Sequence, residues 1–247
     1  MNPAAYEELD ETESTHWWFV GRRAIVTAVI GRLALPKPAR ILEIGCGTGG
    51  NIEMLSKHGV LSAMETDAAA RAMANRKANG ACVVEAGTCP DDLPFTAASF
   101  DLVCMFDVLE HIDEDVATLA AVRRLLAPGG RALITVPAYA WMWSGHDEFL
   151  HHKRRYTAST LEEKARRAGL CMVKQSYFNA ALFPLAVLVR LQARLFRRNG
   201  TTGGAVPPSP INALFGRILA AERRVVARSG LPFGLSLLCV LERNGRA

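Results

Sequence analysis

Three glycines, Gly45, Gly47 and Gly49, follow a short apolar segment that contains a carboxylate, Glu43. Because glycine has no Cβ, such a turn can adopt positive φ and let a ligand approach the backbone closely. With Gly50, the spacing also satisfies the pattern of a dinucleotide site. However, Glu43 would repel a pyrophosphate, whereas it can accept hydrogen bonds from an ammonium group. The residues therefore favour a cationic nucleoside as the ligand.

A second carboxylate, Glu65, ends the next predicted strand, about 20 residues after the glycine turn. At that position a carboxylate can accept hydrogen bonds from both hydroxyls of a ribose. Asp67, two residues later, suits the N-cap of the following helix. Together, the glycine turn and the two glutamates predict a nucleoside-binding site.

The segment Glu43-Ile-Gly-Cys-Gly-Thr-Gly49 resembles the first motif of the class I S-adenosylmethionine-dependent methyltransferases, of the type 11 and 12 kind. The Pro-Gly-Gly turn at 128–130 and the order of segments from 40 to 137 match that family as well. The resemblance implies a Rossmann-like sheet, S-adenosylmethionine as the cofactor, and transfer of its methyl group to an oxygen or nitrogen. Where many relatives place an aspartate after the third strand, this chain has Thr88. The cofactor contacts implied by the resemblance are Glu43, Gly45, Cys46, Gly47, Gly49, Glu65, Thr66, Thr88, Cys89 and Asp107.

Alternating strands and helices predict a doubly wound, mostly parallel α/β sheet of seven strands. We expect the strands at 41–44, 60–65, 82–86, 100–106, 131–136, 170–177 and 234–242, the last antiparallel as the resemblance implies. We expect helices at 50–57, 68–79 and 113–126, and a further one that ends at Leu35. The chain divides into an N-terminal helical lid (1–39), a cofactor-binding core (40–178) with an acceptor loop (137–157), a helical insertion (179–230) and the final strand of the core (231–247).

Polar residues that could act on a methyl acceptor follow the fourth and fifth strands. The carboxyl ends of parallel strands share one edge of the sheet, so Asp107 and His111 should lie beside the glycine turn. A histidine could orient or deprotonate the acceptor, although His111 could equally cap or pack a helix. The candidate catalytic residues are Asp107, His111, His146 and Tyr156. His146, Asp147, His151 and His152 could also be read as metal ligands, but the transferred methyl group is already an electrophile, so we expect no metal.

Aromatic and basic residues in the lid and the acceptor loop predict acceptor binding. Trp17 and Trp18 suit a lid, or alternatively a plug over the edge of the sheet. Arg154 and Arg155 suit a carboxylate or phosphate, or alternatively a solvated surface. The expected acceptor contacts are Trp17, Trp18, Trp141, His151, Arg154 and Arg155.

The charge is distributed unevenly along the chain. Residues 1–136 carry 12 Lys and Arg against 18 Asp and Glu, whereas residues 137–247 carry 17 against 6. This asymmetry favours an anionic partner near the C-terminal half, such as a membrane surface or a phosphorylated acceptor, with a solvated cationic face as the alternative. We see no nucleic-acid recognition module.

The insertion combines apolar stripes with arginines in two predicted helices, 180–198 and 211–228, joined by a Gly- and Pro-rich linker (199–210) that we expect to be mobile. Its apolar run of about ten residues is too short to span a bilayer. The helices could lie in a membrane interface, form a homodimer face, or close over the site as a hydrophobic lid.

The remaining features bear on location and on the class of function. No N-terminal stretch has the pattern of an export signal, and the six cysteines form no Cys-x-x-Cys pair. We expect a cytoplasmic protein, with membrane association left open. The main hypothesis is a methyltransferase acting on a small-molecule or lipid-linked acceptor. The alternatives are an NAD-dependent oxidoreductase and a non-catalytic, membrane-associated scaffold that binds S-adenosylmethionine.

Overall fold

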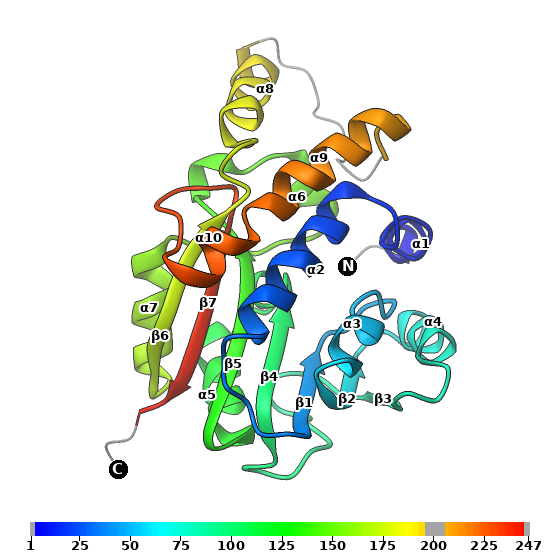
Figure 1. Cartoon of the computed structure of the whole chain (residues 1–247), viewed down its shortest axis with the longest axis vertical. Coiled ribbons are helices and arrows are strands. Elements are labelled where there is room, and N and C mark those ends of the chain that lie inside the picture. Colours follow the sequence, from blue (N-terminus) through cyan, green and yellow to red (C-terminus); the bar gives the residue numbers. More distant parts are fainter. Residues whose placement is uncertain (1–2, 196–205, 245–247) are drawn as a thin grey trace.

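The computed structural model describes residues 3–195 and 206–244. Seven strands form one sheet in the order β3-β2-β1-β4-β5-β7-β6 (Figure 1). The strands are β1 (Ala39–Ile44), β2 (Gly59–Glu65), β3 (Val84–Ala86), β4 (Phe100–Phe106), β5 (Leu126–Pro137), β6 (Leu170–Phe178) and β7 (Ser236–Arg243). The pairs from β3 to β5 are parallel, and β7 pairs antiparallel with both β5 and β6. The predicted seven-stranded sheet with an antiparallel last strand is confirmed.

Helices cover both faces of this sheet. They are α1 (Pro3–Thr12), α2 (Trp17–Ile30), α3 (Ile52–Ser56), α4 (Ala68–Ala78), α5 (Asp115–Leu125), α6 (Gly145–Phe149), α7 (Ala158–Arg167), α8 (Phe183–Leu195), α9 (Ser209–Ala221) and α10 (Arg223–Arg228). Two 3₁₀ turns, η1 (Leu109–His111) and η2 (Ala140–Met142), follow β4 and β5. In Figure 1, α2, α9 and α10 lie in front of the sheet, whereas α5 and α7 lie behind it.

The central strand β4 is buried along its whole length, as expected for a strand of a parallel sheet that is covered on both faces. Successive side chains of a strand point to opposite faces. Leu102 and Cys104 therefore pack with α2 and the insertion, whereas Val103 and Met105 pack with α5 and α7. The hydrophobic core accordingly has two layers, one on each side of the sheet.

Several predicted boundaries differ from the structure. The helix predicted to reach Leu35 is α2, which ends at Ile30, because the next N–H groups, those of Arg32 and Leu33, donate to carbonyls only three residues back. The helix predicted at 50–57 is shortened to α3, and the predicted N-terminal lid contains an additional helix, α1, ahead of α2. Strand β5 begins earlier than predicted because Leu126 pairs with Phe100 before the chain bulges.

The insertion also differs in detail. Its second predicted helix is divided into α9 and α10 at Glu222. The Glu222 carboxylate accepts hydrogen bonds from the backbone N–H groups of Asn179, Ala180 and Ala181, at 2.7, 2.9 and 2.9 Å. Residues 196–205, which include most of the predicted linker, lie outside the described residues. Through these hydrogen bonds, Glu222 ties the second half of the insertion to the first residues of the insertion.

Helix α9 is packed firmly on α2. Leu219 is fully buried against Gly21, and the rings of Trp17 and Phe215 meet edge to face at 5.6 Å. In contrast, α8 leaves four large apolar side chains about half exposed, and it projects from the body of the protein in Figure 1. Within residues 3–195 and 206–244, no helix has both the length and the apolar character needed to cross a bilayer.

Candidate functional site

The glycine turn connects β1 to α3 at the carboxyl edge of the sheet. Gly45, Gly47 and Gly49 have φ of +69°, +56° and +94°, in the region that other residues rarely adopt. A Cβ on Gly45 would lie 2.8 Å from a methyl group of Val108. The turn is therefore in direct contact with the segment that follows β4.

Glu43 lies beneath this turn and is 1% exposed. One carboxylate oxygen accepts a hydrogen bond from the Asn51 side chain at 2.7 Å, whereas the other has no hydrogen-bond partner among the described residues. Burial raises the pKa of Glu43 to about 8, because the charged form has lost its water. A ligand ammonium group would supply both the missing donor and a compensating charge, so Glu43 fits the methionyl end of S-adenosylmethionine.

Glu65, at the end of β2, joins the strand to the glycine turn. Its two oxygens accept hydrogen bonds from the backbone N–H groups of Gly47, at 2.8 Å, and Asp67, at 3.0 Å, and it also accepts from the hydroxyl of Tyr6. Each carboxylate oxygen has two lone pairs, so these bonds leave acceptor capacity for ribose hydroxyls. Asp67 caps α4 through Ala70, as the sequence predicts.

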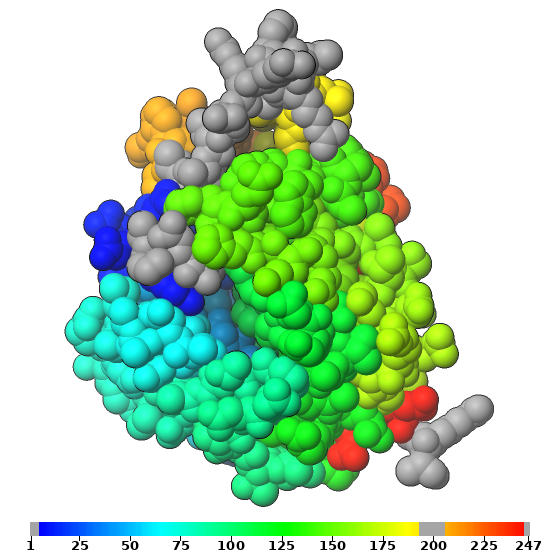
Figure 2. Space-filling model, turned by 180° about the vertical axis from the view of Figure 1, so that it is seen from behind, coloured from blue at the N-terminus to red at the C-terminus, as the bar shows by residue number. Residues whose placement is uncertain are grey.

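Helix α1 lies over the glycine turn. Leu9 comes within 3.4 Å of the position that a Cβ on Gly47 would take. Asp10 of α1 and Glu13, which directly follows this helix, form ion pairs with Lys77 of α4, and Arg23 donates to the carbonyl of Glu13 at 2.7 Å. In the space-filling view, a hollow separates the cyan and green parts of the surface; lighter blue atoms are visible inside it, and the dark blue atoms from the start of the chain lie at its upper end (Figure 2). The N-terminal segment thus borders the predicted cofactor site.

Trp17 and Trp18, predicted to contact the acceptor, pack elsewhere. Trp17 meets Phe215 of α9, and Trp18 stacks on Phe178 of β6 with ring centroids 5.5 Å apart. This placement corresponds to the alternative weighed from the sequence, a plug over the sheet, and fastens α2 to the insertion.

Asp107 follows β4 with φ of +57°. Its carboxylate accepts from the Thr135 hydroxyl at 3.1 Å and forms an ion pair with Arg22 of α2. The Arg22 side chain is only 7% exposed and lies over the rings of Phe19 and Phe106. The sequence analysis did not assign Arg22 to the site, although an arginine inside an apolar helix was a signal. Asp107 is thus held at the edge of the glycine turn with its charge balanced.

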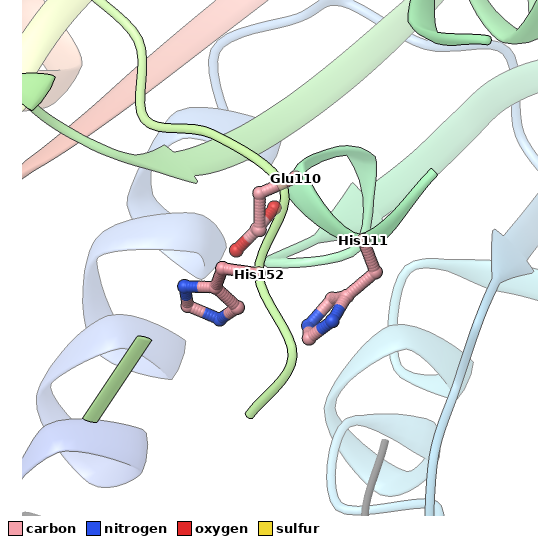
Figure 3. Close-up of side chains that lie close together, drawn as sticks. All are labelled: Glu110, His111 and His152. Atoms are coloured by element: carbon pink, nitrogen blue, oxygen red, sulfur yellow. The ribbon is translucent and has the colours of Figure 1, made fainter. Parts of the chain in front are cut away.

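Glu110, His111 and His152 form a group that we call the Glu110 cluster. One donor atom from each side chain lies within 4.8 Å of the other two. Figure 3 shows Glu110 and His111 on the η1 turn and His152 on the neighbouring acceptor loop, with the side chains directed toward a common space. The rings of His111 and His152 meet edge to face at 4.7 Å. Of the three residues, the sequence analysis placed only His111 in the site.

Burial dominates the electrostatics of this cluster. Glu110 has no exposed surface, and neither of its carboxylate oxygens has a hydrogen-bond partner in the part of the chain that the structure describes. Burial, followed by the nearby charge of Asp107, raises the pKa of Glu110 well above its ordinary value. Burial also lowers the pKa of His111 to about 3, so this imidazole is neutral at physiological pH.

Asp147 of α6 holds His152 in place. Its fully buried carboxylate accepts from both Nε and Nη2 of Arg155, at 2.7 and 3.0 Å, and from the N–H of Ser144, at 2.9 Å. It also lies 2.9 Å from Nδ1 of His152. Although burial alone would raise it, the hydrogen bonds from His152 and Arg155 keep the pKa of Asp147 well below its usual range. Because Nδ1 is occupied, Nε2 is the nitrogen that His152 offers to the cluster.

The arginines and the tyrosine of the acceptor loop are all engaged within the protein. Arg155 is bound to Asp147, whereas Arg154 pairs with Asp115 at 2.7 Å and the Tyr156 hydroxyl donates to Asp115 at 3.1 Å. Alternate residues of an extended segment point to opposite sides, so 154 and 156 face α5 while 155 faces α6. Tyr156 is 1% exposed, and its hydroxyl is directed toward Asp115 and the carbonyl of Leu109. The structure therefore does not bring Arg154 or Tyr156 into the Glu110 cluster.

The other predicted acceptor residues lie around the rim. The His146 ring lies 6.3 Å from that of His152, and His151 is exposed with φ of +56°. Trp141 is half exposed and stacks on Tyr139 at 5.7 Å. These positions leave His146 close to the cluster and Trp141 on the outer surface.

The remaining predicted cofactor contacts lie beside the ends of β2 and β3. The Thr66 hydroxyl donates to the carbonyl of Gly87 at 2.8 Å, and the backbone of Thr88 pairs with Asp92. The thiols of Cys46 and Cys89 are buried, and burial raises the pKa of both, that of Cys89 to about 11. These contacts place the Thr66 and Thr88 loops side by side, while the thiols serve as packing.

Comparison with known proteins supports the interpretation of these motifs. The sequence model of a family described as "Methyltransferase domain" matches residues 20–175, more than half of the chain. The ubiquinone biosynthesis O-methyltransferase of Cereibacter sphaeroides is 34% identical over 105 residues, which cover 40% of this chain and 42% of that protein. The O-methyltransferase rstn1 of Aspergillus nomiae is 33% identical over 118 residues, covering 44% and 52%. The chain thus spans about half the length, or less, of these curated relatives.

Solved structures share the fold at low sequence identity. One is a chain of the complex between the Haloferax volcanii Trm112 methyltransferase activator and a methyltransferase, with a TM-score of 0.62, 18% identity, and coverage of 99% of this chain and 95% of that one. Another is phosphoethanolamine N-methyltransferase 2 of Haemonchus contortus in complex with S-adenosyl-L-methionine, with a TM-score of 0.58, 16% identity, and coverage of 87% and 51%.

Substitution of Asp115 should destabilise the acceptor loop. The carboxylate is bound by Lys164 and Arg154, and although burial opposes them, these cations hold its pKa below the ordinary value. Asp115→Asn should lower the free energy of unfolding at pH 7 by about 2 kcal/mol. This value lies between the small contribution of an exposed salt bridge and the larger cost of breaking a buried one. Because the folded-state pKa is depressed, this contribution is present above the unfolded pKa of about 3.9 and is lost as the pH falls through the folded value.

Urea denaturation of the wild type and the variant at several pH values measures this difference. Asp113→Asn is the matched control, since the Asp113 side chain is 63% exposed, and it should change stability by less than about 0.5 kcal/mol. A wild-type advantage that grew on acidification would contradict the assignment.

Proposed function

The chain belongs to the family of methyltransferase domains, and we propose that it transfers a methyl group from S-adenosylmethionine to an oxygen of a small-molecule or lipid-linked acceptor. The class I resemblance read from the motifs is confirmed at the level of family and fold. The observation that carries the proposed activity is the unpaired, buried oxygen of Glu43 beneath the glycine turn. An oxygen acceptor is favoured over nitrogen because relatives in this part of the chain are named as O-methyltransferases.

The cofactor site is proposed to use residues from both sides of the glycine turn. Glu43 would accept hydrogen bonds from the ammonium group, Glu65 would accept from the ribose, and the N-terminal helix α1, which carries Tyr6 beside Glu65, would cover the bound molecule. A nicotinamide dinucleotide would place its pyrophosphate against the buried Glu43 carboxylate, which is electrostatically unfavourable. The oxidoreductase alternative also lacks support from the family match.

S-adenosylmethionine supplies a methyl group made electrophilic by the positive sulfur to which it is bonded. The protein's part is to align the acceptor oxygen with that methyl group and to exclude water, which lowers the entropic barrier to reaction. Asp107, held by Arg22 and Thr135, would border the reacting groups. The sequence offers His111 or His146 for removal of the acceptor proton, and of these two we propose His146.

A lipid-linked acceptor is supported by the surface of α8. Leu185, Leu188, Val189 and Leu191 are each about half exposed on this one helix. At its base, the ring of Phe183 contacts the half-exposed rings of Trp141 and Phe233. An apolar helix bordered by aromatic rings suits the interface of a bilayer, and the excess of Lys and Arg in this half of the chain suits anionic lipids.

The same helix adjoins the acceptor loop. Arg190 of α8 lies 4.0 Å from the carboxylate of Asp147, and Phe183 contacts Trp141. A bilayer bound by α8 would therefore lie next to the Glu110 cluster. We accordingly propose that the protein works in the cytoplasm at an anionic membrane surface, with a homodimer formed through α8 as the competing arrangement.

Replacement of Glu43 by glutamine should weaken S-adenosylmethionine binding by about 10- to 100-fold, the range expected for losing a hydrogen bond to a charged group. Isothermal titration calorimetry with S-adenosylmethionine and with NAD measures the effect. Glu53→Gln is the matched control, since that side chain is 88% exposed, and it should leave the affinity unchanged. Equal affinity of the folded Glu43→Gln and wild-type proteins would refute the role of Glu43, and binding of NAD alone would refute the cofactor assignment.

Methyl transfer itself can be measured with S-adenosylmethionine labelled in the methyl group and a fractionated cell extract. The label should move to an organic-soluble product and be retained as an ether or ester of an acceptor oxygen. Label recovered on nitrogen would contradict the choice of acceptor atom. If no fraction accepts label although the protein binds S-adenosylmethionine, the non-catalytic scaffold is the better interpretation.

Removal of the apolar surface of α8 should weaken membrane binding. In sedimentation with phosphatidylglycerol-containing vesicles, Leu188→Gln combined with Leu191→Gln should lower the affinity for the vesicles at least about tenfold, because each half-exposed leucine can contribute about half of the 1.5–3 kcal/mol of a fully buried one. Val60→Gln is the control, since Val60 is 62% exposed but lies at the start of β2. Wild-type protein that stays in the supernatant but dissociates from dimer to monomer in the double variant would support a homodimer face instead.

A further inference from the structure

The Glu110 cluster joins side chains from two segments about forty residues apart in sequence, so the sequence alone does not indicate that they lie together. We propose that Glu110, His111 and His152 bind one divalent transition-metal ion at the acceptor edge of the sheet. Their donor atoms lie within 4.8 Å of one another, and the side chains converge on one space in Figure 3. A single ion could bridge such donors after small side-chain adjustments.

Glu110 provides the first independent support. Its side chain has no exposed surface, and both oxygens lack a hydrogen-bond partner within the described residues. Burying an uncompensated carboxylate is energetically costly, and buried charges in proteins are normally paired or coordinated to a metal. Arg22 is already paired with Asp107, and Arg155 with Asp147. A bound cation would therefore coordinate a buried carboxyl group that the neighbouring arginines do not contact directly.

The hydrogen bond between His152 and Asp147 provides the second. A metal-binding histidine usually donates its other ring N–H to a carboxylate, which fixes both the tautomer and the orientation of the ring. Here Nδ1 of His152 lies 2.9 Å from the fully buried Asp147, which Arg155 and Ser144 hold in turn. His152 thus offers Nε2 to the cluster from an orientation that is set in advance.

The donor set indicates the class of metal. Two imidazoles and one carboxylate suit zinc, manganese, iron or cobalt, whereas magnesium and calcium prefer sites made of oxygen donors. Three protein ligands leave one or more coordination positions for water or a substrate, as in catalytic rather than structural sites. We therefore expect Zn²⁺ and Mn²⁺ to bind and Mg²⁺ to bind much more weakly.

The location of the Glu110 cluster in the fold indicates which ligand would complete the coordination of the ion. Glu110 and His111 follow Asp107 in the η1 turn, whose preceding residue, Val108, contacts the glycine turn. The ion would thus lie on the acceptor side of the cofactor, where it could bind an acceptor hydroxyl and lower the pKa of that hydroxyl. This role rests on the proposed methyl transfer. It favours acceptors with a second oxygen donor next to the methylated hydroxyl, which could chelate the ion.

The acidity of this edge makes a cation beside a cationic cofactor acceptable. Glu43, Glu65, Asp107 and Glu110 all lie at or near the carboxyl ends of β1, β2 and β4, and Arg22 neutralises only Asp107. The half of the chain that builds this edge also carries more acidic than basic residues. Repulsion between the ion and the sulfonium would therefore be offset by nearby carboxylates.

Metal binding to the whole protein tests the site directly. Protein stripped with a chelator and exchanged into metal-free buffer should bind one Zn²⁺ or Mn²⁺ per chain in calorimetric titration. Glu110→Gln and His152→Ala should each weaken that binding at least tenfold, with folding checked by circular dichroism. His58→Ala is the matched control because it removes an imidazole at the start of β2, away from the cluster, and should leave the affinity unchanged.

Two results would overturn the site: no stoichiometric binding of either ion, or binding that persists in both cluster variants, which would indicate another location. The role is tested separately with labelled S-adenosylmethionine. Removing metal should lower methyl transfer at least tenfold while leaving S-adenosylmethionine affinity unchanged. If transfer survives chelation but is lost in His152→Ala, the ion does not hold the acceptor and His152 acts directly. If metal binds but S-adenosylmethionine does not, the proposed function fails while the site stands.

Discussion

The hydrogen bonds of one fully buried carboxylate, Asp147, organise the reaction side of this protein. Asp147 binds both nitrogens of the Arg155 fork, the N–H of Ser144 and the ring of His152. Arg155 in turn donates to the carbonyl of Ala138, where the chain leaves β5. A buried charge tolerates few arrangements of its partners, because each lost hydrogen bond leaves a group without compensation. The acceptor loop therefore has a defined shape, although it contains only two short helical segments.

The cofactor side follows a different rule, in which buried carboxyl groups are left without partners. Glu43 keeps one oxygen without a partner among the described residues, and Glu110 keeps both. An unpaired buried carboxylate destabilises the folded protein, so such groups are retained where a ligand supplies the missing charge. Two under-compensated acids on the same edge suit two cationic partners, the donor of the methyl group and a metal ion. In the proposed assignment, Glu43 and Glu110 therefore gain their missing partners only when both ligands are bound.

The insertion brings a third element to the same edge. Glu222 closes it on itself by accepting from three backbone N–H groups, and α9 anchors it on α2 through Leu219 and Gly21. With this anchor in place, α8 can expose its leucines while Arg190 and Phe183 stay against the acceptor loop. The packing of α9 on α2 therefore places the apolar surface of α8 next to the proposed reaction site, although the insertion lies far from β4 in the sequence.

The sequence alone determined that strands and helices alternate along the chain around a glycine turn, and it predicted roles for Glu43 and Glu65, since these inferences depend on local periodicity and on spacing within one strand–turn–helix unit. It did not reveal that Arg22 neutralises Asp107, that Arg154 and Tyr156 turn away toward Asp115, or that Glu110 and His152 share a space. Those contacts join residues 39 to 85 positions apart. Only tertiary packing decides them, because the direction of a side chain across a loop is set by its partner and not by its neighbours in the chain.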